Sequence, residues 1–598
     1  MNRKTVCGLL CAGLLLNGAS LTPLLHTVTV QAEQAAEIEY DFIDGTAYVK
    51  RVSAVGELTV PSTVTDSNGS SARVVGIYAD AFRGSSVSAV KLPETLTQIG
   101  DGAFADCVDL KSVDFSSASV TLGNKVFSGD TAVELTGTEN ILYVGSCALD
   151  GTTYAEQAGS GDVYIGKCLY KSTASGHVTL KDGTLSIAPE VFADNTDITS
   201  VSLGDKFRII GDYAFSGCTS LSSVDFGSSL TEIGTGAFES SGIAGNPNLP
   251  DTLEKIGAYA FSGCSNLTEI NLLYASKLTS LPNGAFYNCT SLESAALPFE
   301  AKSIGDSCFA KDARLSAVYC GYVEIIGKDA FRDCAAVSDR YAFTSAKLVG
   351  AGAFEGTAIL ANNDNPELYI GNVLYRMQPS DYVSLMVTVS SVTERAAVGS
   401  TFDYLYLSEN VMSIGEKALP THDGTTIVSL SESEAVYRYF DGLSYKKLYL
   451  PIGVTSKKPQ NAEYITGIEL ASLPTQTTCK PGKPFDDSGI SVKLVTENGE
   501  KRDADFYSLS YNFYQSNVVT VRCGKFSTSF TITVLPNYTV GDLDGNGSVD
   551  SVDLLTMRQY LAGLLNEKDF VFEAADTDGN GSVDSSDLLE LRRMLTGL

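Results

Sequence analysis

Large apolar residues recur along this chain with a spacing of 22 or 23 residues over most of its length. The clearest marker is a phenylalanine that in most copies follows a small residue and precedes alternating apolar and polar positions. It occurs at Phe82, Phe104, Phe127, Phe192, Phe215, Phe238, Phe261, Phe286, Phe309, Phe331 and Phe354. A unit this short cannot bury its apolar face alone, whereas stacked copies can. The pattern predicts a solenoid whose repeats each form a short strand, a turn and a further extended or helical piece.

Each phenylalanine belongs to a longer motif. Ile210-Gly211 precedes Ala214-Phe215, and Cys218 and Leu221 follow at fixed distances. We expect the Ile-Gly step to form a turn where glycine either adopts a positive φ or allows a close backbone approach. The Ala-Phe pair supplies a small residue where coils meet and a large one for the interior.

These motifs resemble the leucine-rich repeats of BspA-like bacterial surface proteins over roughly residues 40–455. The resemblance implies a strand-rich α/β solenoid spanning residues 33–455, with a binding or adhesive role. Tyr164-Ile165-Gly166 is echoed by Tyr369-Ile370-Gly371, and we expect both to form hairpins that interrupt the solenoid. Residues 38–60 are predicted to form an N-terminal capping hairpin, and 380–455 to be degenerate repeats closing the other end.

Short alternating segments replace the repeat between residues 462 and 535, which predicts an antiparallel β-sandwich. The succession Ile468-Glu469-Leu470, Lys480-Pro481-Gly482-Lys483 and Gly489-Ile490 resembles bacterial immunoglobulin-like (Ig-like) domains. That resemblance implies an Ig-like spacer rather than a dedicated ligand site.

Residues 540–598 contain two copies of an acidic twelve-residue loop. Oxygen-bearing side chains occupy positions 1, 3, 5, 9 and 12, glycine occupies position 6, and position 7 offers its carbonyl, a spacing that wraps a loop around calcium. The predicted ligands are Asp542, Asp544, Asn546, Ser548, Asp550 and Asp553, then Asp576, Asp578, Asn580, Ser582, Asp584 and Asp587. Repulsion among four aspartates per loop should keep the module open without a cation. We therefore predict two calcium ions as part of the fold.

An apolar stripe follows each loop and predicts one helix there. The stripes are Leu554, Leu555, Met557 and Leu561, then Leu588, Leu589, Leu591 and Leu595. A duplicated loop and helix without an entering helix resembles the type I dockerin family. The resemblance implies a small all-α module over 540–598 that docks, with calcium, onto a cohesin module of a cellulosome scaffold protein.

The family's partner-reading positions 10, 11, 17 and 18 map onto both copies. They correspond to Ser551, Val552, Arg558 and Gln559, and to Ser585, Ser586, Arg592 and Arg593. Val552 and Gln559 differ from their counterparts, so the type of cohesin and the equivalence of the two faces stay open.

Five of the thirteen cysteines fall three residues after a repeat phenylalanine, where other repeats carry Asn, Asp or Ser. A position that accepts these residues requires a small group that can form hydrogen bonds. We therefore interpret the five cysteines as structural thiols: Cys107, Cys218, Cys264, Cys289 and Cys334. Cys147, Cys168, Cys308 and Cys320 show no pattern and are left unpaired. A disulfide between Cys479 and Cys523 is a hypothesis, because they are alone in their module.

The N-terminus predicts a secretory signal peptide over residues 1–32. Arg3 and Lys4 precede an apolar run, and Val30-Gln31-Ala32 offers a cleavage site. A lipoprotein signal at Cys11 is the alternative, although Leu10 stands where a small residue is expected. No later segment is apolar for the roughly 20 residues that a membrane helix needs. The net charge of -29 argues against nucleic acid and anionic lipid as partners.

The sequence therefore favours a secreted, multidomain, non-catalytic binding protein. The expected partners are a cohesin and an unknown protein, cell-surface or carbohydrate ligand of the repeats. Carbohydrate binding in polysaccharide degradation is the main alternative, with tyrosines replacing the missing tryptophan. Glycoside hydrolysis is a weaker one, because no acid and nucleophile pair is evident. His26 falls in the signal segment, and we expect His177 and His422 to be surface or loop residues.

Overall fold

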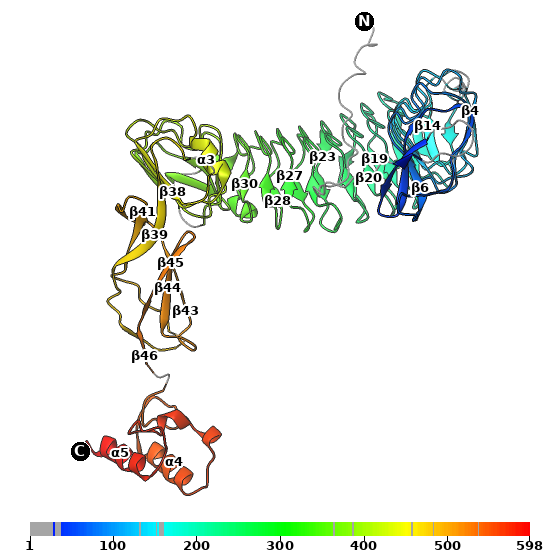
Figure 1. The fold of residues 1–598 in the computed structure, drawn as a ribbon. Helices are drawn as coiled ribbons and strands as arrows, with labels where there is room; N and C mark the ends of the chain where they lie inside the picture. The colour runs from blue at the N-terminus through cyan, green and yellow to red at the C-terminus, as the bar shows by residue number, and fades with distance from the viewer. Residues whose placement is uncertain are drawn as a thin grey trace. The chain divides into compact units, whose positions relative to one another are not determined.

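A computed structural model (Figure 1) describes residues 28–29 and 38–597, apart from 131–132, 151, 153, 155–160, 363–364, 386–387, 456–457, 482 and 536–537. The predicted signal peptide lies outside the described residues except for Val28-Thr29. The chain divides into two compact units, residues 1–364 and 365–598. This division falls inside the predicted repeat region 33–455.

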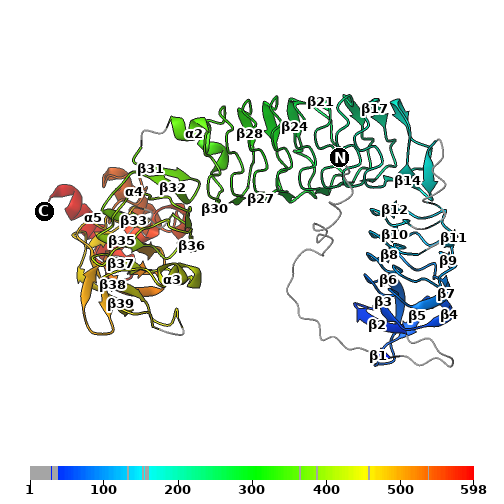
Figure 2. The same ribbon diagram turned by 90° about the horizontal axis from the view of Figure 1, so that it is seen from above.

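Parallel strands stack in rows along the first unit (Figure 2). One sheet joins β1 (Val28–Thr29), β2 (Ile38–Ile43), β3 (Thr46–Val52), β5 (Thr63–Thr65), β6 (Ser71–Ile77), β8 (Gln98–Ile99), β10 (Thr121–Leu122) and β12 (Tyr143–Val144). A second sheet joins β4 (Val55–Thr59), β7 (Ser86–Lys91), β9 (Ser112–Asp114) and β11 (Glu134–Thr136). The antiparallel pair of β2 and β3 confirms a hairpin at the predicted N-terminal position.

A hairpin then begins a new set of sheets. β13 (Val163–Ile165) and β14 (Cys168–Lys171) are antiparallel, and β14 continues in parallel into the next repeats. That sheet adds β16 (Ser186–Ile187), β18 (Ile209–Ile210), β20 (Glu232–Ile233) and β22 (Lys255–Ile256), and a separate one contains β15 (Gly176–Thr179), β17 (Ile198–Ser202) and β19 (Ser223–Asp225). The predicted hairpin around Tyr164-Ile165-Gly166 is therefore present.

The remaining repeats of this unit form three further sheets. These are β21 (Ala244–Gly245) with β23 (Asn266–Leu267); β24 (Glu269–Asn271), β26 (Ser294–Ala296) and β28 (Ala317–Tyr319); and β25 (Ser280–Leu281), β27 (Ser303–Ile304), β29 (Ile325–Ile326) and β30 (Leu348–Val349). Two short helices, η1 (Arg340–Phe343) and α2 (Ala358–Ala361), lie near the end.

Where repeat phenylalanines occupy successive coils, their rings stack on one another in the core. From Phe192 to Phe354, successive ring centroids lie 5.1–5.6 Å apart with interplanar angles of 3–14°. Leu149 is fully buried in the corresponding turn between Phe127 and Phe192. The stack explains why the aromatic residue recurs once per coil.

The piece after each Ile-Gly step is a pair of tight turns, so the helical alternative is wrong for these repeats. The residue just before the Ala-Phe pair is left-handed, with φ of 55° at Tyr213 and 61° at Gly102, which breaks any helix. The Ile-Gly glycine has no positive φ. A Cβ on Gly211 would lie 2.6 Å from the backbone of Ala188 in the preceding coil, so close approach is the reason for glycine.

The second unit starts with the other predicted hairpin, β31 (Glu367–Ile370) and β32 (Val373–Met377), which leads into β34 (Ser391–Val392) and β36 (Ser413–Ile414). Its larger sheet has the order β33 (Tyr382–Leu385), β35 (Tyr404–Leu407), β37 (Thr426–Ser429), β38 (Lys447–Pro451), β39 (Ala462–Ser472), β41 (Ser491–Thr496) and β42 (Lys501–Asp503), and α3 (Glu434–Phe440) lies between β37 and β38 in the chain.

This sheet crosses the boundary that the sequence suggested near residue 460. β39 pairs in parallel with β38, with Leu448 opposite Ala462, and then pairs antiparallel with β41. The other strands after 472 are β40 (Thr478–Cys479) with β46 (Thr533–Val534), and β43 (Ser508–Tyr511) with β44 (Val518–Cys523) and β45 (Phe526–Thr531). The strand pairing does not show an Ig-like sandwich, because part of the sheet belongs to the repeats.

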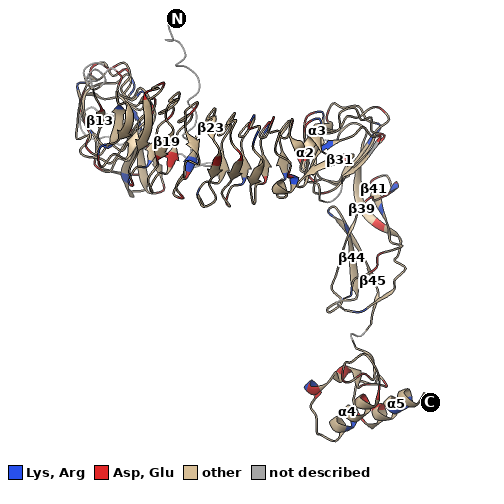
Figure 3. Cartoon of the chain, turned by 180° about the vertical axis from the view of Figure 1, so that it is seen from behind, with Lys and Arg blue, Asp and Glu red and all other residues tan. Residues whose placement is uncertain are grey.

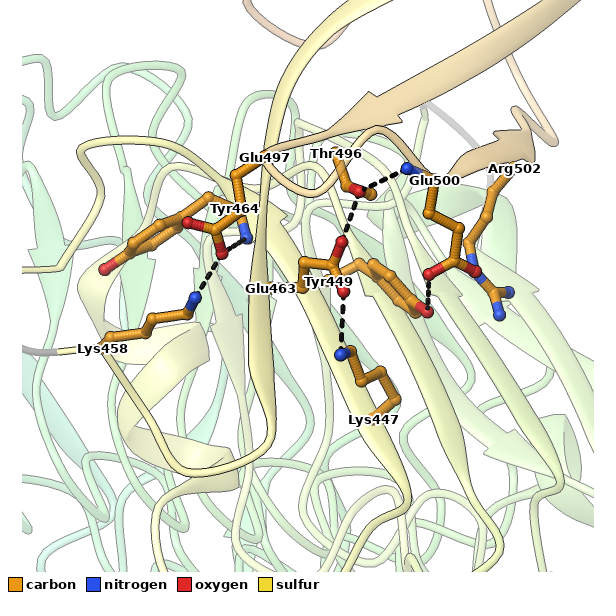
Figure 4. Close-up of polar contacts among 9 residues, drawn as sticks. All are labelled: Lys447, Tyr449, Lys458, Glu463, Tyr464, Thr496, Glu497, Glu500 and Arg502. Atoms are coloured by element: carbon orange, nitrogen blue, oxygen red, sulfur yellow. Dashed lines mark hydrogen bonds and ion pairs between the residues drawn. The ribbon is translucent and has the colours of Figure 1, made fainter.

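Polar side chains reinforce this junction (Figure 4). Glu463 is buried, and its carboxylate pairs with Nζ of Lys447 at 2.8 Å and accepts a hydrogen bond from Thr496. Burial alone would raise the pKa of Glu463, but these partners outweigh it and lower the pKa. The hydroxyl of Tyr449 donates to Glu500 at 2.9 Å.

The hypothesis of a disulfide between Cys479 and Cys523 is wrong in this structure, where both are free and buried. Cys479 packs with Phe485 and Val519, whereas Cys523 packs with Tyr406, in a separate cluster. The sequence placed both in one module, but Cys523 faces the last repeats. Their side chains therefore serve two different cores.

Candidate calcium-binding loops and docking face

The first acidic loop is organised around Asp553, which is fully buried. Its carboxylate accepts hydrogen bonds from the backbone N–H groups of Leu543 at 2.7 Å, Asp544 at 3.0 Å and Asp550 at 2.8 Å. Gly547, with φ of 91°, donates its N–H to Asp542 Oδ2 at 2.9 Å. The carboxylate at position 12 thus holds the start and the end of the loop together through hydrogen bonds.

The second loop repeats this geometry. Asp587 is fully buried and accepts from Thr577 at 2.7 Å, Asp578 at 3.1 Å and Asp584 at 2.8 Å. Gly581 donates to Asp576 Oδ2 at 2.9 Å. The two loops therefore have the same fold, as their sequences predict.

Three predicted ligands of each loop meet at one point. Carboxylate oxygens of Asp542, Asp544 and Asp553 all lie within 4.8 Å of one another, and so do those of Asp576, Asp578 and Asp587. Among the described residues, Oδ1 of Asp542 is also buried with no hydrogen-bond partner. A hard divalent cation such as calcium would satisfy it. The donor set fits calcium, while the ligand roles of single residues remain predictions.

The other predicted ligands have structural tasks here. Asp550 caps helix α4 (Ser551–Leu561) by accepting from Val552, and Asp584 caps α5 (Ser585–Thr596) by accepting from Ser586. The hydrogen bonds from Ser586 lower the pKa of Asp584. The side-chain oxygens of Asn546 and Asn580 accept from Ser548 and Ser582, both at 2.9 Å. These contacts fix the conformation of both loops.

The two helices expected after the loops are present, but their apolar stripes are only partly buried. Met557 and Leu591 are fully buried against Leu543 and Ala575, and Leu554 and Leu588 pack beside them. Leu555 and Leu589, which belong to the predicted stripes, are 54% and 50% exposed. They occupy the same position in both copies, one residue past the core leucine and on the outer side of each helix.

The predicted partner-reading residues lie on these helices. Seven of them are exposed, and Gln559 is half-buried: Ser551, Val552, Arg558 and Gln559 on α4, and Ser585, Ser586, Arg592 and Arg593 on α5. Arg593 pairs with Glu590 at 3.1 Å. Each helix thus presents a small polar end and a basic end beside an exposed leucine.

The five repeat cysteines form a column of hydrogen bonds inside the solenoid. Each thiol donates to the carbonyl oxygen of the phenylalanine one coil earlier, for example Cys264 to Phe238 at 3.1 Å and Cys334 to Phe309 at 2.9 Å. Burial raises the pKa of Cys218 to about 11 and that of Cys264 to about 12. Such thiols are unsuited to catalysis or metal binding, which agrees with their structural interpretation.

Two of the unassigned cysteines also follow the repeat. Cys308 stands directly before Phe309, where other coils carry alanine, and Cys147 is the left-handed residue of its turn, with φ of 54°. Neither residue lies three positions after a repeat phenylalanine, so the pattern of the other cysteines did not reveal them.

Both described histidines are on the surface. His177 lies in β15, not in a loop, and its Nδ1 is 2.7 Å from Oγ of Ser200 on the neighbouring strand. It borders a hollow of about 430 Å³ with Ser223, Asp225 and Asn248. His422 lies in a loop, with Nε2 3.2 Å from Asp403.

A further surface feature escaped the sequence analysis. Of the exposed large aromatic residues in the described part of the first unit, most lie between residues 274 and 341. Tyrosine count alone could not reveal this clustering, because most tyrosines elsewhere in the chain are at least partly buried. The sequence signal for this cluster is an aromatic residue that follows the strand in successive repeats.

Comparison with known families supports two regions of the chain. The BspA type leucine rich repeat region matches in overlapping segments from residue 70 to 426, more than half of the chain. The type I dockerin domain matches residues 540–596. Both families are non-catalytic binding domains. No curated protein sequence matches this chain.

Several solved structures are similar to it. A leucine rich cell surface protein of Faecalibacterium prausnitzii is 21% identical, covering 57% of this chain and 94% of its own, with a TM-score of 0.21. A leucine-rich repeat protein of Bacteroides ovatus is 22% identical, with coverage of 53% and 98% and a TM-score of 0.20. The pneumococcal vaccine antigen PcpA is 15% identical, with coverage of 50% and 98% and a TM-score of 0.19. Such low TM-scores support no functional inference.

Proposed function

The chain belongs to the BspA-type leucine-rich repeat family, and from this premise we propose that it is a secreted, non-catalytic binding protein held in a cellulosome. Its type I dockerin domain supplies the attachment, since dockerins bind calcium and dock onto cohesin modules. The repeats present the surface for a second ligand, which is a protein, a cell-surface component or a carbohydrate.

The paired three-carboxylate clusters are the observation that carries the docking proposal. Two calcium ions, one per loop, neutralise the aspartates and hold the loops against α4 and α5. The exposed ends of these helices then keep a fixed geometry for a partner. In this proposal Ser551, Val552, Arg558 and Gln559 form one docking face, and Ser585, Ser586, Arg592 and Arg593 form the other.

The proposed localisation is extracellular, which is typical of both families. In the part of the chain that the structure describes, no helix is both long and apolar enough to cross a membrane. Residues 462–535 are proposed as an Ig-like spacer, although their first sheet is shared with the repeats.

Capture of the full chain by immobilised cohesins, with calcium and with excess chelator, tests the attachment. We expect capture by at least one cohesin of a panel, lost on chelation and restored by calcium. The paired variants S551A/R558A and S585A/R592A separate the two docking faces. Binding that chelation leaves unchanged, or that survives disruption of both faces together, contradicts the proposal.

A further inference from the structure

Three aromatic side chains stand out of the repeat surface on consecutive coils. Tyr274, Phe299 and Tyr322, which we call the aromatic row, are 65%, 53% and 62% exposed. Tyr319 at the end of β28 and Tyr341 in η1 extend the cluster, at 62% and 69% exposed. Large exposed apolar groups that gather in one place mark interaction sites more often than scattered ones do.

The strand register aligns the row. Asn271, Ala296 and Tyr319 are paired in sequence across β24, β26 and β28, and each ring of the row follows its paired residue by three positions. Neighbouring strands are spaced by about 4.8 Å. A Cβ on Gly321 would lie 3.9 Å from the Phe299 ring, so this ring lies beside the turn that carries Tyr322.

The charges around the row are largely balanced. Lys277 pairs with Glu254, and Lys347 pairs with Glu324 at 3.0 Å. Lys302 lies with Nζ 5.6 Å from the centroid of Tyr322. Acidic and basic segments are interspersed along the repeats of this unit (Figure 3). The surface around the aromatic row therefore offers no stripe of one charge that would attract a charged polymer.

We propose that the aromatic row binds an uncharged polysaccharide chain, an inference that rests on the binding role proposed for the repeats. A sugar ring has an apolar C–H face and a polar rim, which matches exposed Tyr and Phe faces with polar neighbours. The rings stand on separate turns with polar residues such as Ser276 and Glu300 between them. This differs from the dry, central apolar cluster of a protein interface. Because coils repeat along the solenoid as sugars repeat along a chain, one extended polysaccharide contacts several rings.

Affinity electrophoresis of the full chain in gels containing xyloglucan, arabinoxylan or mixed-linkage β-glucan tests the inference. Wild-type protein is expected to be retarded by at least one of them. The variant Y274A/F299A/Y322A is expected to bind that polysaccharide at least tenfold more weakly. The matched control Y213A/Y259A removes two exposed tyrosines from other turns of the same unit, 38% and 44% exposed, and should bind as wild type.

Circular dichroism and thermal melting of each variant establish that it is folded. Failure of the wild type to bind any of these polysaccharides overturns the inference, as does unchanged binding by the triple variant or equal loss in the control. Binding only to polygalacturonate or to gelatin assigns the row to a charged polymer or a protein instead, and also overturns it. Cohesin capture in parallel keeps the outcome separate from the docking proposal, which can hold or fail independently.

Discussion

The hydroxyl of Tyr406, in a repeat strand, lies 3.8 Å from Sγ of Cys523, in the module that follows the repeats. Both residues are buried, and they share a cluster with Val428, Tyr449 and Leu494. The outer face of the last repeat sheet is therefore covered by the module. The module caps the solenoid and is more than a separate spacer.

This shared core predicts coupled unfolding. Leu494→Ala removes a side chain that is 1% exposed and should lower the free energy of unfolding by about 2–4 kcal/mol. Hydrogen exchange should increase in β35 and β38 as well as in β41, because one cluster supports all three. Ser508→Ala, at an exposed position in β43, is the control. Faster exchange confined to residues 462–535 would show that the module is independent.

The two module cysteines provide a second prediction. Without reductant, alkylation of the denatured chain should label both Cys479 and Cys523, because neither is bridged. Alkylation of the native chain should leave both unlabelled, since both are buried. Peptide mass spectrometry distinguishes these states, and a linked pair of peptides would restore the disulfide hypothesis.

The cysteine column predicts an order of stabilities at Cys264. Cys264→Val keeps the volume but leaves the Phe238 carbonyl without its donor, so we expect a loss of about 1–3 kcal/mol. Cys264→Ser keeps a donor and should lose less, as Ser241 occupies the equivalent position one coil earlier. Denaturant unfolding measures both. Equal losses would mean that the hydrogen bond contributes nothing.

Asp130 occupies the same repeat position as the column cysteines and is fully buried, and burial raises its pKa from 3.8 to about 7. The folded state therefore holds a proton that the unfolded state releases between these values. The contribution of Asp130 to stability should be greatest below pH 4 and fall as pH rises to 7, by on the order of 3–4 kcal/mol. Asp130→Asn, which imitates Asn195, should remove this component. Identical pH profiles of wild type and variant would contradict it.

Calcium binding should depend on both position-12 aspartates. Asp553→Asn and Asp587→Asn should each abolish one of two calorimetric binding events, because each residue joins a three-carboxylate cluster and gathers its loop. The control Asp569→Asn lies in η2 (Glu567–Asp569), outside both loops. Two unaltered binding events in either loop variant would exclude these residues as ligands.

Much of this architecture could be predicted from sequence, because the local pattern repeats. The period of the phenylalanines predicted the stack, and the oxygen spacing predicted both loops. The junction could not be predicted from alternation, since β39 follows β38 without a break in pairing. A usable signal was present in Tyr404-Leu405-Tyr406-Leu407, which is apolar on both faces and therefore needs a cover on each side.

The site was predicted less completely than the fold. The acidic loop follows a fixed spacing, so the cluster of Asp542, Asp544 and Asp553 could be predicted from sequence. The aromatic row could not be predicted from the repeat pattern. The side of the turn on which each ring is exposed depends on turn lengths, and these vary between repeats. The exposure of Leu555 could not be predicted, because a stripe with two adjacent leucines does not reveal which one faces outward.

The column of buried cysteine thiols affects how the protein would resist oxidation in the extracellular location that we propose for it. Oxidants and mixed disulfides react with exposed thiolates, and here burial keeps these groups protonated and out of reach. The folded protein should then persist in air or among oxidised small thiols without disulfide exchange at these residues. An exported chain that is still unfolded would expose these same thiols, so rapid closure of the coils would protect them.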